Sequence, residues 1–152
     1  MEKSGPDKLS LVVFSSEFDK IHYALVMASA AQATNRQATL FFTMGACRAL
    51  LKKAPNGGFP WREMSLSARD NLTEVSQDGG QRNDHFQNVG VGEFEELLGA
   101  CVELGVSFMV CEMGLRAEGI ARSDLREDVP LEEGGVVTFL NDASKDGTVL
   151  FI

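Results

Sequence analysis

Four short, uninterrupted apolar runs constrain the fold of this chain more than any other feature of its sequence. They cover residues 11–14, 40–42, 108–110 and 149–152 and are rich in β-branched or aromatic residues. A strand with one solvated face alternates polar and apolar residues, whereas a strand buried on both faces is apolar throughout. The runs therefore predict buried strands of a parallel sheet that is covered by helices.

Helical patterns fill the intervals between these runs. An S-x-x-D capping box at residues 16–19 predicts the start of a helix that ends near Asn35. Apolar residues within 94–104 fall on one side of a second helix, and Gly105 is a suitable stop for it. Shorter helices are predicted over residues 46–53, 61–72, 115–120 and 135–145.

The order of these elements is the alternation that builds βαβ units. Parallel neighbours need a crossover connection, and such crossovers are right-handed in nearly all known cases. We therefore predict an α/β fold with a doubly wound, mainly parallel sheet.

One segment departs from this alternation. Residues 54–91 contain prolines and glycines and then a polar stretch with little periodicity. Connections this long are uncommon inside a compact domain and usually form a lid, a binding loop or a disordered stretch. A length of 152 residues fits one domain. We predict a single domain over 1–152 with a long irregular excursion at about 54–91.

The charge balance excludes several classes of partner. The chain has 14 lysines and arginines against 22 aspartates and glutamates, a net charge of −8. Nucleic acids and anionic membranes attract basic patches, so we expect neither as a partner. The polar start over residues 1–8 and the lack of an apolar stretch long enough for a bilayer favour a cytoplasmic protein without a signal peptide.

The sequence contains no cofactor or metal motif. It lacks C-x-x-C, H-E-x-x-H, zinc-like ligand spacing, a Walker A loop and a G-x-S-x-G elbow. The Gly90-Val91-Gly92 stretch precedes a helix but follows no strand, so it is not a dinucleotide fingerprint. We expect no bound cofactor and no metal.

Three cysteines remain as candidates for chemistry, and their odd number argues against a disulfide framework. In open parallel sheets, ligands bind beyond the carboxyl ends of the strands. Cys111 ends the third apolar run and Cys47 follows the second, whereas Cys101 lies on the apolar side of a helix. We interpret Cys101 as a core residue. Cys47 is either a resolving or relay partner of Cys111 or a structural first-turn residue.

The surroundings of Cys111 contain features that suit a reactive thiol. Backbone N–H groups near Gly114, at the start of the predicted helix, and the charge of Arg116 would stabilise a thiolate, while Glu112 acts in the opposite direction. The alternative is a buried structural thiol. His22, in the first turn of the first predicted helix, is a candidate base or anion ligand, with capping or surface exposure as the alternatives.

Several sequence blocks, taken in order, resemble a known family. They are FEELL at 94–98, ELGV at 103–106, VCEMGL at 110–115, EGI at 118–120, GVVTFL at 135–140 and TVLFI at 148–152, with YALVMA at 23–28 and TLFFT at 39–43 fitting the same pattern. Together they resemble the DsrE/DsrF-like (DsrEFH) sulfur-relay family, most closely its branch with a Cys-x-Met motif after the third strand. The chain departs from that branch at Met44-Gly45, where an aromatic residue often precedes the glycine, and over 54–90, which is polar and largely non-basic.

The resemblance implies a three-layer α/β/α fold around a mainly parallel sheet of about five strands, often assembled into trimers or hexamers. It also implies sulfur relay, in which a cysteine carries a persulfide and passes it between partner proteins; Cys111 matches that cysteine. Two hypotheses follow. The first is a sulfur carrier or sulfurtransferase acting through Cys111, with a donor or acceptor protein as partner. The second is a non-catalytic, oligomeric module that binds a ligand or protein, with a structural Cys111 and residues 54–90 closing over the crevice. Whether the chain is an enzyme stays open at this point.

Overall fold

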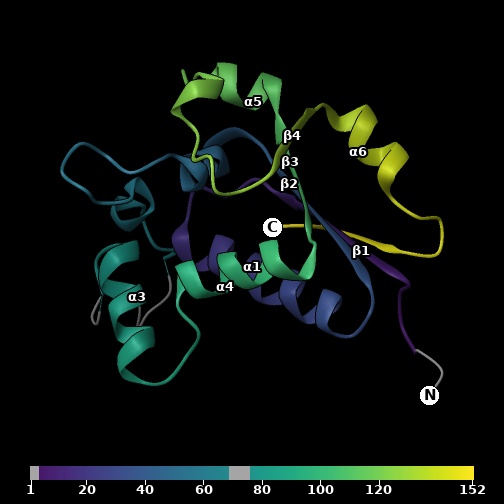
Figure 1. The fold of residues 1–152 in the computed structure, drawn as a ribbon, viewed down its shortest axis with the longest axis horizontal. Coiled ribbons are helices and arrows are strands. Elements are labelled where there is room, and N and C mark those ends of the chain that lie inside the picture. Colours follow the sequence, from purple (N-terminus) through teal and green to yellow (C-terminus); the bar gives the residue numbers. More distant parts are fainter. Residues whose placement is uncertain (1–3, 69–75) are drawn as a thin grey trace.

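The computed structural model describes residues 4–68 and 76–152 and contains one five-stranded sheet. The strand order is β4-β3-β2-β1-β5, and every neighbouring pair is parallel. The strands are β1 (Lys8–Val13), β2 (Gln37–Phe42), β3 (Ser107–Cys111), β4 (Leu131–Gly134) and β5 (Thr148–Phe151). The predicted α/β fold with a parallel, doubly wound sheet is thus confirmed (Figure 1).

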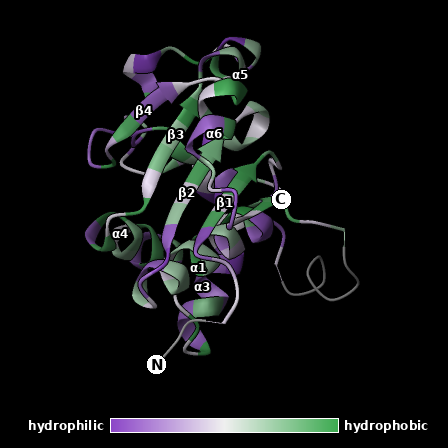
Figure 2. Ribbon diagram, turned by 90° about the vertical axis from the view of Figure 1, so that its right-hand side faces the viewer, coloured by the Kyte–Doolittle hydropathy of each residue, from purple (hydrophilic) through white to green (hydrophobic). Residues whose placement is uncertain are grey.

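Helices cover the two faces of the sheet unequally. On one face α1 (Phe18–Ala33) packs beside α4 (Phe94–Leu104), and α3 (Gly79–Asn88) contacts α1. On the other face lies α6 (Val136–Asp142), and the short α5 (Glu112–Ala117) continues directly from β3 (Figures 1 and 2). The 3₁₀ turns are η1 (Met44–Leu50), η2 (Pro60–Glu63) and η3 (Arg122–Asp124). Within the described ranges, no helix is long and apolar enough to cross a membrane.

Among the residues that the structure describes, the buried apolar side chains form two clusters on opposite faces of the sheet. The larger cluster joins one side of β1, β2 and β3 to α1 and α4. The smaller consists of Phe41, Met109, Cys111 and Phe139, with Val12 packed against it. Phe139 is the one residue of α6 in that cluster, and its ring lies 5.1 Å from that of Phe41. Cys111 therefore belongs to the thinly covered face.

This face is left open toward β5. Phe151 is paired in register with Val12, and Val12 with Phe41, so the three side chains share the face that α6 covers. Phe151 is nevertheless 69% exposed and Val149 is 48% exposed. The α6 helix thus covers the β2–β3 half of the face and leaves the β1–β5 half to solvent.

Most predicted elements are present, but several local predictions are wrong. The fourth apolar run forms β5, yet this strand is largely exposed because it lies at the edge of the sheet. The helix predicted over 46–53 is the 3₁₀ turn η1. The helix over 94–104 ends at Gly105, whose φ of 88° is the left-handed cap expected there. The predicted capping box of α1 is not formed, because Glu17 is the N-cap residue and its side chain makes no capping bond. Instead Asp19 accepts hydrogen bonds from the backbone and hydroxyl of Ser67. The strand β4 was not among the apolar runs, because at this sheet edge its two glutamates are exposed (Figure 2).

The segment 54–91 differs from a purely irregular excursion. It contains η2 and α3, and its Trp61 is buried against Phe18 and Phe94. The predicted helix over 61–72 is reduced to η2 in the described part, and residues 69–72 lie outside the described residues. The helix α3 was not predicted because it is mostly polar. It is held by Asp78, which caps it by accepting from Gln81 N–H.

Candidate functional site

Cys111 lies where the strand β3 passes into α5, at the carboxyl edge of the sheet. It is the last residue of β3 and the N-cap residue of α5. It forms part of a pocket of about 450 Å³. The residues lining this pocket, called the Cys111 pocket below, are Cys111, Glu112, Met113, Arg116, Gly135, Val136 and Val137.

Cys111 is almost fully buried at the wall of that pocket. The residue is 2% exposed and packs with Phe41, Met109 and Phe139. The Gly114 N–H donates a hydrogen bond to its Sγ over 3.4 Å. A backbone donor in this position can stabilise negative charge on sulfur, and this role of Gly114 stays a prediction.

Gly114 has a second, steric role. A Cβ on this residue would lie 2.5 Å from the backbone nitrogen of Met44 and 2.9 Å from Thr43 Oγ1. Only a residue without a side chain permits this approach of α5 to the end of β2. The contact brings η1, which carries Cys47, against the helix that follows Cys111.

Cys47 is a neighbour of Cys111 but is closed off from solvent. It is fully buried in the main core. Burial, with smaller contributions from the nearby Cys111 and Glu118, raises the pKa of its thiol to about 12. Cys47 therefore stays a thiol at neutral pH.

Arg116 lies beside Cys111 but already has a charge partner. Its guanidinium contacts Glu112 at 3.2 Å, one helical turn away, and both side chains are largely exposed. An exposed pair of this kind is weak, but it places a carboxylate beside the cation that the sequence predicts near the thiol. Among the described residues that line the pocket, Arg116 is the only cation.

The two remaining candidates lie elsewhere. Cys101 is buried in the core, as predicted; its Sγ–H donates to the Leu25 carbonyl, and burial raises the pKa of its thiol to about 12. His22 is not a surface or capping residue. It is buried, donates from Nε2 to the Gly92 carbonyl over 2.8 Å and packs on the Phe86 ring. Its burial lowers its pKa, and it does not line the Cys111 pocket.

Sequence reasoning missed the wall of the pocket formed by Gly135, Val136 and Val137. These residues follow β4, and the carboxyl ends of parallel strands meet at one edge of a sheet. The Gly134-Gly135 pair marks that end in the sequence. This pair was not recognised in the sequence as the end of a strand, because β4, at the edge of the sheet, is not an apolar run.

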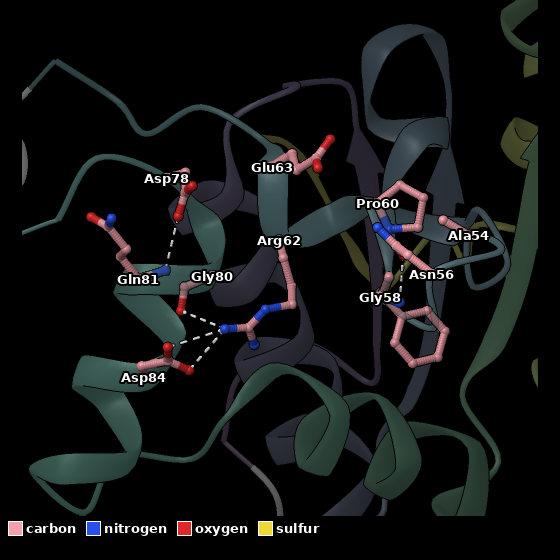
Figure 3. Close-up of a pocket in the computed structure, with 11 residues that line it drawn as sticks. Ala54, Asn56, Gly58, Pro60, Arg62, Glu63, Asp78, Gly80, Gln81 and Asp84 are labelled. Carbon is pink, nitrogen blue, oxygen red and sulfur yellow. Dashed lines mark hydrogen bonds and ion pairs between the residues drawn. The ribbon is translucent and has the colours of Figure 1, made fainter.

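Other hollows lie near the same edge or in the 54–91 segment. One of about 790 Å³ is bordered by the ends of β1, β2 and β5 and by α1. Another, of about 340 Å³, lies between η2 and α3, where Arg62 points toward Asp84 and the Gly80 carbonyl (Figure 3). Among the described residues lining these two hollows there is no cysteine or histidine. No described residue of 54–91 lines the Cys111 pocket.

The described residues offer no metal centre, since no group of three histidines, cysteines, aspartates or glutamates gathers among them. What the site provides is one thiol in a pocket, one backbone N–H directed at it, and mostly apolar walls. Such a site suits chemistry at sulfur.

Comparisons with known proteins identify the family. The profile of the DsrE/DsrF/DrsH-like family matches residues 6–151. The chain is 26% identical over 156 residues to the uncharacterized protein YrkE of Bacillus subtilis (strain 168), which covers 95% of this chain and 96% of YrkE. Two solved structures are similar over 95% of this chain and 98% of theirs, each with a TM-score of 0.49. They are MTH1491 from Methanobacterium thermoautotrophicum, at 12% identity, and the ychN protein from E. coli, at 14%. Because the profile spans nearly the whole sequence, this chain belongs to the DsrE/DsrF/DrsH-like family.

Proposed function

We propose that this protein carries sulfane sulfur as a persulfide on Cys111 and passes it from a donor to an acceptor. The observation that carries the proposal is that Cys111, alone among the three cysteines, lines a pocket, while Cys47 and Cys101 are sealed in the core. Family membership supports sulfur relay as the general role.

The proposed chemistry needs a thiolate and no cofactor. The Cys111 thiolate attacks the outer sulfur of a donor persulfide, R–S–SH. A bond forms between Cys111 Sγ and that sulfur, the donor S–S bond breaks, and the donor leaves as R–S⁻. An acceptor thiolate then attacks the outer sulfur of Cys111–S–SH, which restores the Cys111 thiolate. The Gly114 N–H supports negative charge on Sγ at the beginning and end of this cycle.

We propose that the sulfur donor or acceptor is another protein. We also propose that the protein described here functions in the cytoplasm as a homo-oligomer of three or six copies. The net charge of −8 favours a protein partner with a basic face. A reducing compartment suits a chain whose three cysteines are all free. We propose that the whole chain acts as one domain.

For the oligomer, we propose that a second copy covers the open half of the thinly covered face. This patch, called the β5 face, consists of Phe14, Val149 and Phe151. All three are more than one third exposed, and the rings of Phe14 and Phe151 lie 5.2 Å apart. It is continuous with the unpaired edge of β5, and exposed apolar groups beside an open strand edge favour association.

The proposal is tested by sulfur loading. The purified protein is incubated with an alkyl hydropersulfide, with polysulfide, with thiosulfate, or with a cysteine desulfurase and cysteine, and its intact mass is measured. We expect the mass of one sulfur to be gained and to disappear on treatment with cyanide or a thiol. The gain should be lost in Cys111→Ser and kept in Cys101→Ala and Cys47→Ala. Equal loading of Cys111→Ser, or no loading of the wild type by any donor, would favour the non-catalytic binding module instead.

A further inference from the structure

We propose that the sulfur donor of Cys111 is a persulfide, R–S–SH, whose R group is apolar and uncharged, and not a donor whose R group is anionic. This inference rests on the proposed function and names the chemical class of its substrate. Three features of the Cys111 pocket carry it: the apolar walls, the pairing of its cation with a carboxylate and the burial of Cys111.

The walls of the pocket expose apolar side chains that no other part of the described chain covers. Met113 is 58% exposed, Val136 52% and Val137 72%, and all three line the pocket. Exposed apolar surface next to a reacting group is stabilised when an apolar ligand covers it. The R group of the donor is the part of the substrate that would lie against these three residues.

The polar groups of the pocket do not favour an anion. Arg116 is the only cation among its described lining residues and pairs with Glu112 at 3.2 Å. A donor with an anionic R group must compete with the Glu112 carboxylate for the Arg116 guanidinium. The same carboxylate repels that donor. The net charge of −8 adds repulsion at longer range.

The burial of Cys111 increases the difference between donors. Cys111 is 2% exposed and packs against Phe41 and Phe139, so the sulfur to be transferred must leave water before it reaches Sγ. An anionic group close to that sulfur loses hydration without gaining a free cation, which costs free energy. An apolar R group gains free energy on the same path.

The transfer step is balanced for the donor with an apolar R group. The Cys111 thiolate attacks the outer sulfur of R–S–SH, the bond between Sγ and that sulfur forms, and the S–S bond between the two donor sulfurs breaks. The electron pair leaves on R–S⁻, which takes a proton from water. Cys111–S–SH is formed with no external oxidant or reductant.

The experiment compares two donors that share the S–SH group and differ only in R. One is benzyl hydropersulfide, which is apolar, and the other is 3-sulfopropyl hydropersulfide, which carries a sulfonate. The rate at which Cys111 gains one sulfur is followed by intact mass at equal donor concentration. We expect benzyl hydropersulfide to load at least about tenfold faster, the factor that corresponds to about 1.4 kcal/mol. Added salt should raise only the rate for the sulfonate donor, because salt screens repulsion between charges.

Two variants test whether the difference in loading rate between the two donors arises in the Cys111 pocket. Glu112→Gln should raise the ratio of the sulfonate rate to the benzyl rate several-fold, because it removes the competing carboxylate and frees Arg116, whereas any change in the thiolate fraction of Cys111 affects both rates alike. Glu103→Gln removes an exposed carboxylate on α4 and should change neither rate.

The outcomes separate this inference from the proposed function. Loading of Cys111 by both donors at equal rates, or faster loading by the sulfonate donor, would overturn the inference and leave the sulfur-carrier function standing. Loading by neither donor, nor by any donor in the panel of the preceding section, would overturn the proposed function and the inference together.

Discussion

Gly114 approaches Met44 so closely that a Cβ on Gly114 would stand 2.5 Å from the Met44 backbone nitrogen. The obstructing atoms on the Met44 side are backbone, and Met44 is itself in the left-handed region with a φ of 48°, so it cannot easily move aside. We predict that Gly114→Ala lowers the free energy of unfolding by about 1–3 kcal/mol, the usual cost of overpacking. It should also slow sulfur loading, because the N–H that contacts Cys111 Sγ is displaced.

Gly99 provides the matched control for this substitution. It lies in the middle of α4, and a Cβ there would meet nothing within 4 Å. Gly99→Ala should raise the free energy of unfolding by about 0.5–1 kcal/mol, since alanine is the better helix former. Chemical denaturation of the two variants gives both values. A Gly114→Ala protein as stable as Gly99→Ala would contradict the close approach.

The three cysteines should react with iodoacetamide in a fixed order. Burial raises the pKa of the Cys47 and Cys101 thiols to about 12, so at neutral pH the thiolate fraction of each is very small. Cys111 lines a pocket and should be alkylated first. Peptide mapping after timed quenching measures the order. In denaturant the three alkylation rates should converge. A native protein in which Cys47 reacts as fast as Cys111 would contradict the placement of Cys47 in the core and of Cys111 at a pocket.

His22 should make stability depend on pH below its ordinary pKa of 6.5. Burial lowers its pKa in the folded state, so the unfolded chain binds a proton more readily between the two values. The stability due to neutral His22 is therefore complete above pH 6.5 and decreases as the pH falls through 6.5 toward the folded-state pKa. Urea denaturation on either side of pH 6.5 measures the change. His22→Gln keeps a donor for the Gly92 carbonyl and should show a smaller change than the wild type. An equal change in the two proteins would exclude His22 as its source.

Arg126 should be essential for attaching the 54–91 segment to the rest of the chain. Its side chain is 5% exposed, contacts Glu95 and Asp128 at 2.7 Å each, and lies over the Phe59 ring. Arg126→Met leaves the Glu95 carboxylate without its cation in a half-buried position. This should cost about 1–3 kcal/mol in the free energy of unfolding, because Glu95 is only partly buried and keeps its hydrogen bond from Trp61 Nε1.

The double variant of Arg126→Met with Glu95→Gln tests the cause of that loss. Glutamine at position 95 can still accept from Trp61 Nε1 and carries no charge. Thermal or urea unfolding should therefore show a partial recovery of stability relative to Arg126→Met. No recovery would assign the loss to packing on Phe59 instead of the unpaired charge.

The β5 face should determine the oligomeric state. Phe151→Glu places a charge at the centre of this patch, where Phe151 is 69% exposed, and should convert the oligomer to smaller species in light scattering or native mass spectrometry. Val89→Glu is the matched control, because Val89 is 57% exposed but follows α3, outside the β5 face. If both variants keep the oligomer, or if the wild type is monomeric, the β5 face does not form the interface.

The sequence by itself determined the elements whose signals are local. Buried parallel strands must be apolar on both faces, so β1, β2 and β3 were visible as uninterrupted runs. The helix α4 was visible from its apolar side and from Gly105, and Cys101 followed from its place on that side. Cys111 was found because the last residue of a parallel strand lies at the edge where such sheets bind ligands.

Only the tertiary structure decided what surrounds Cys111, because those contacts join residues distant in sequence. The wall at Gly135–Val137 follows an edge strand whose exposed glutamates give no apolar pattern. Sequence distance could not show that His22 would be buried against Phe86 and Gly92, or that Gly114 would meet Met44. The separation of Cys47, sealed in the main core, from Cys111, open to a pocket, likewise depends on which face of the sheet each residue reaches. Packing decides which face of the sheet each cysteine reaches, because burial is a property of the assembled layers and not of any single segment.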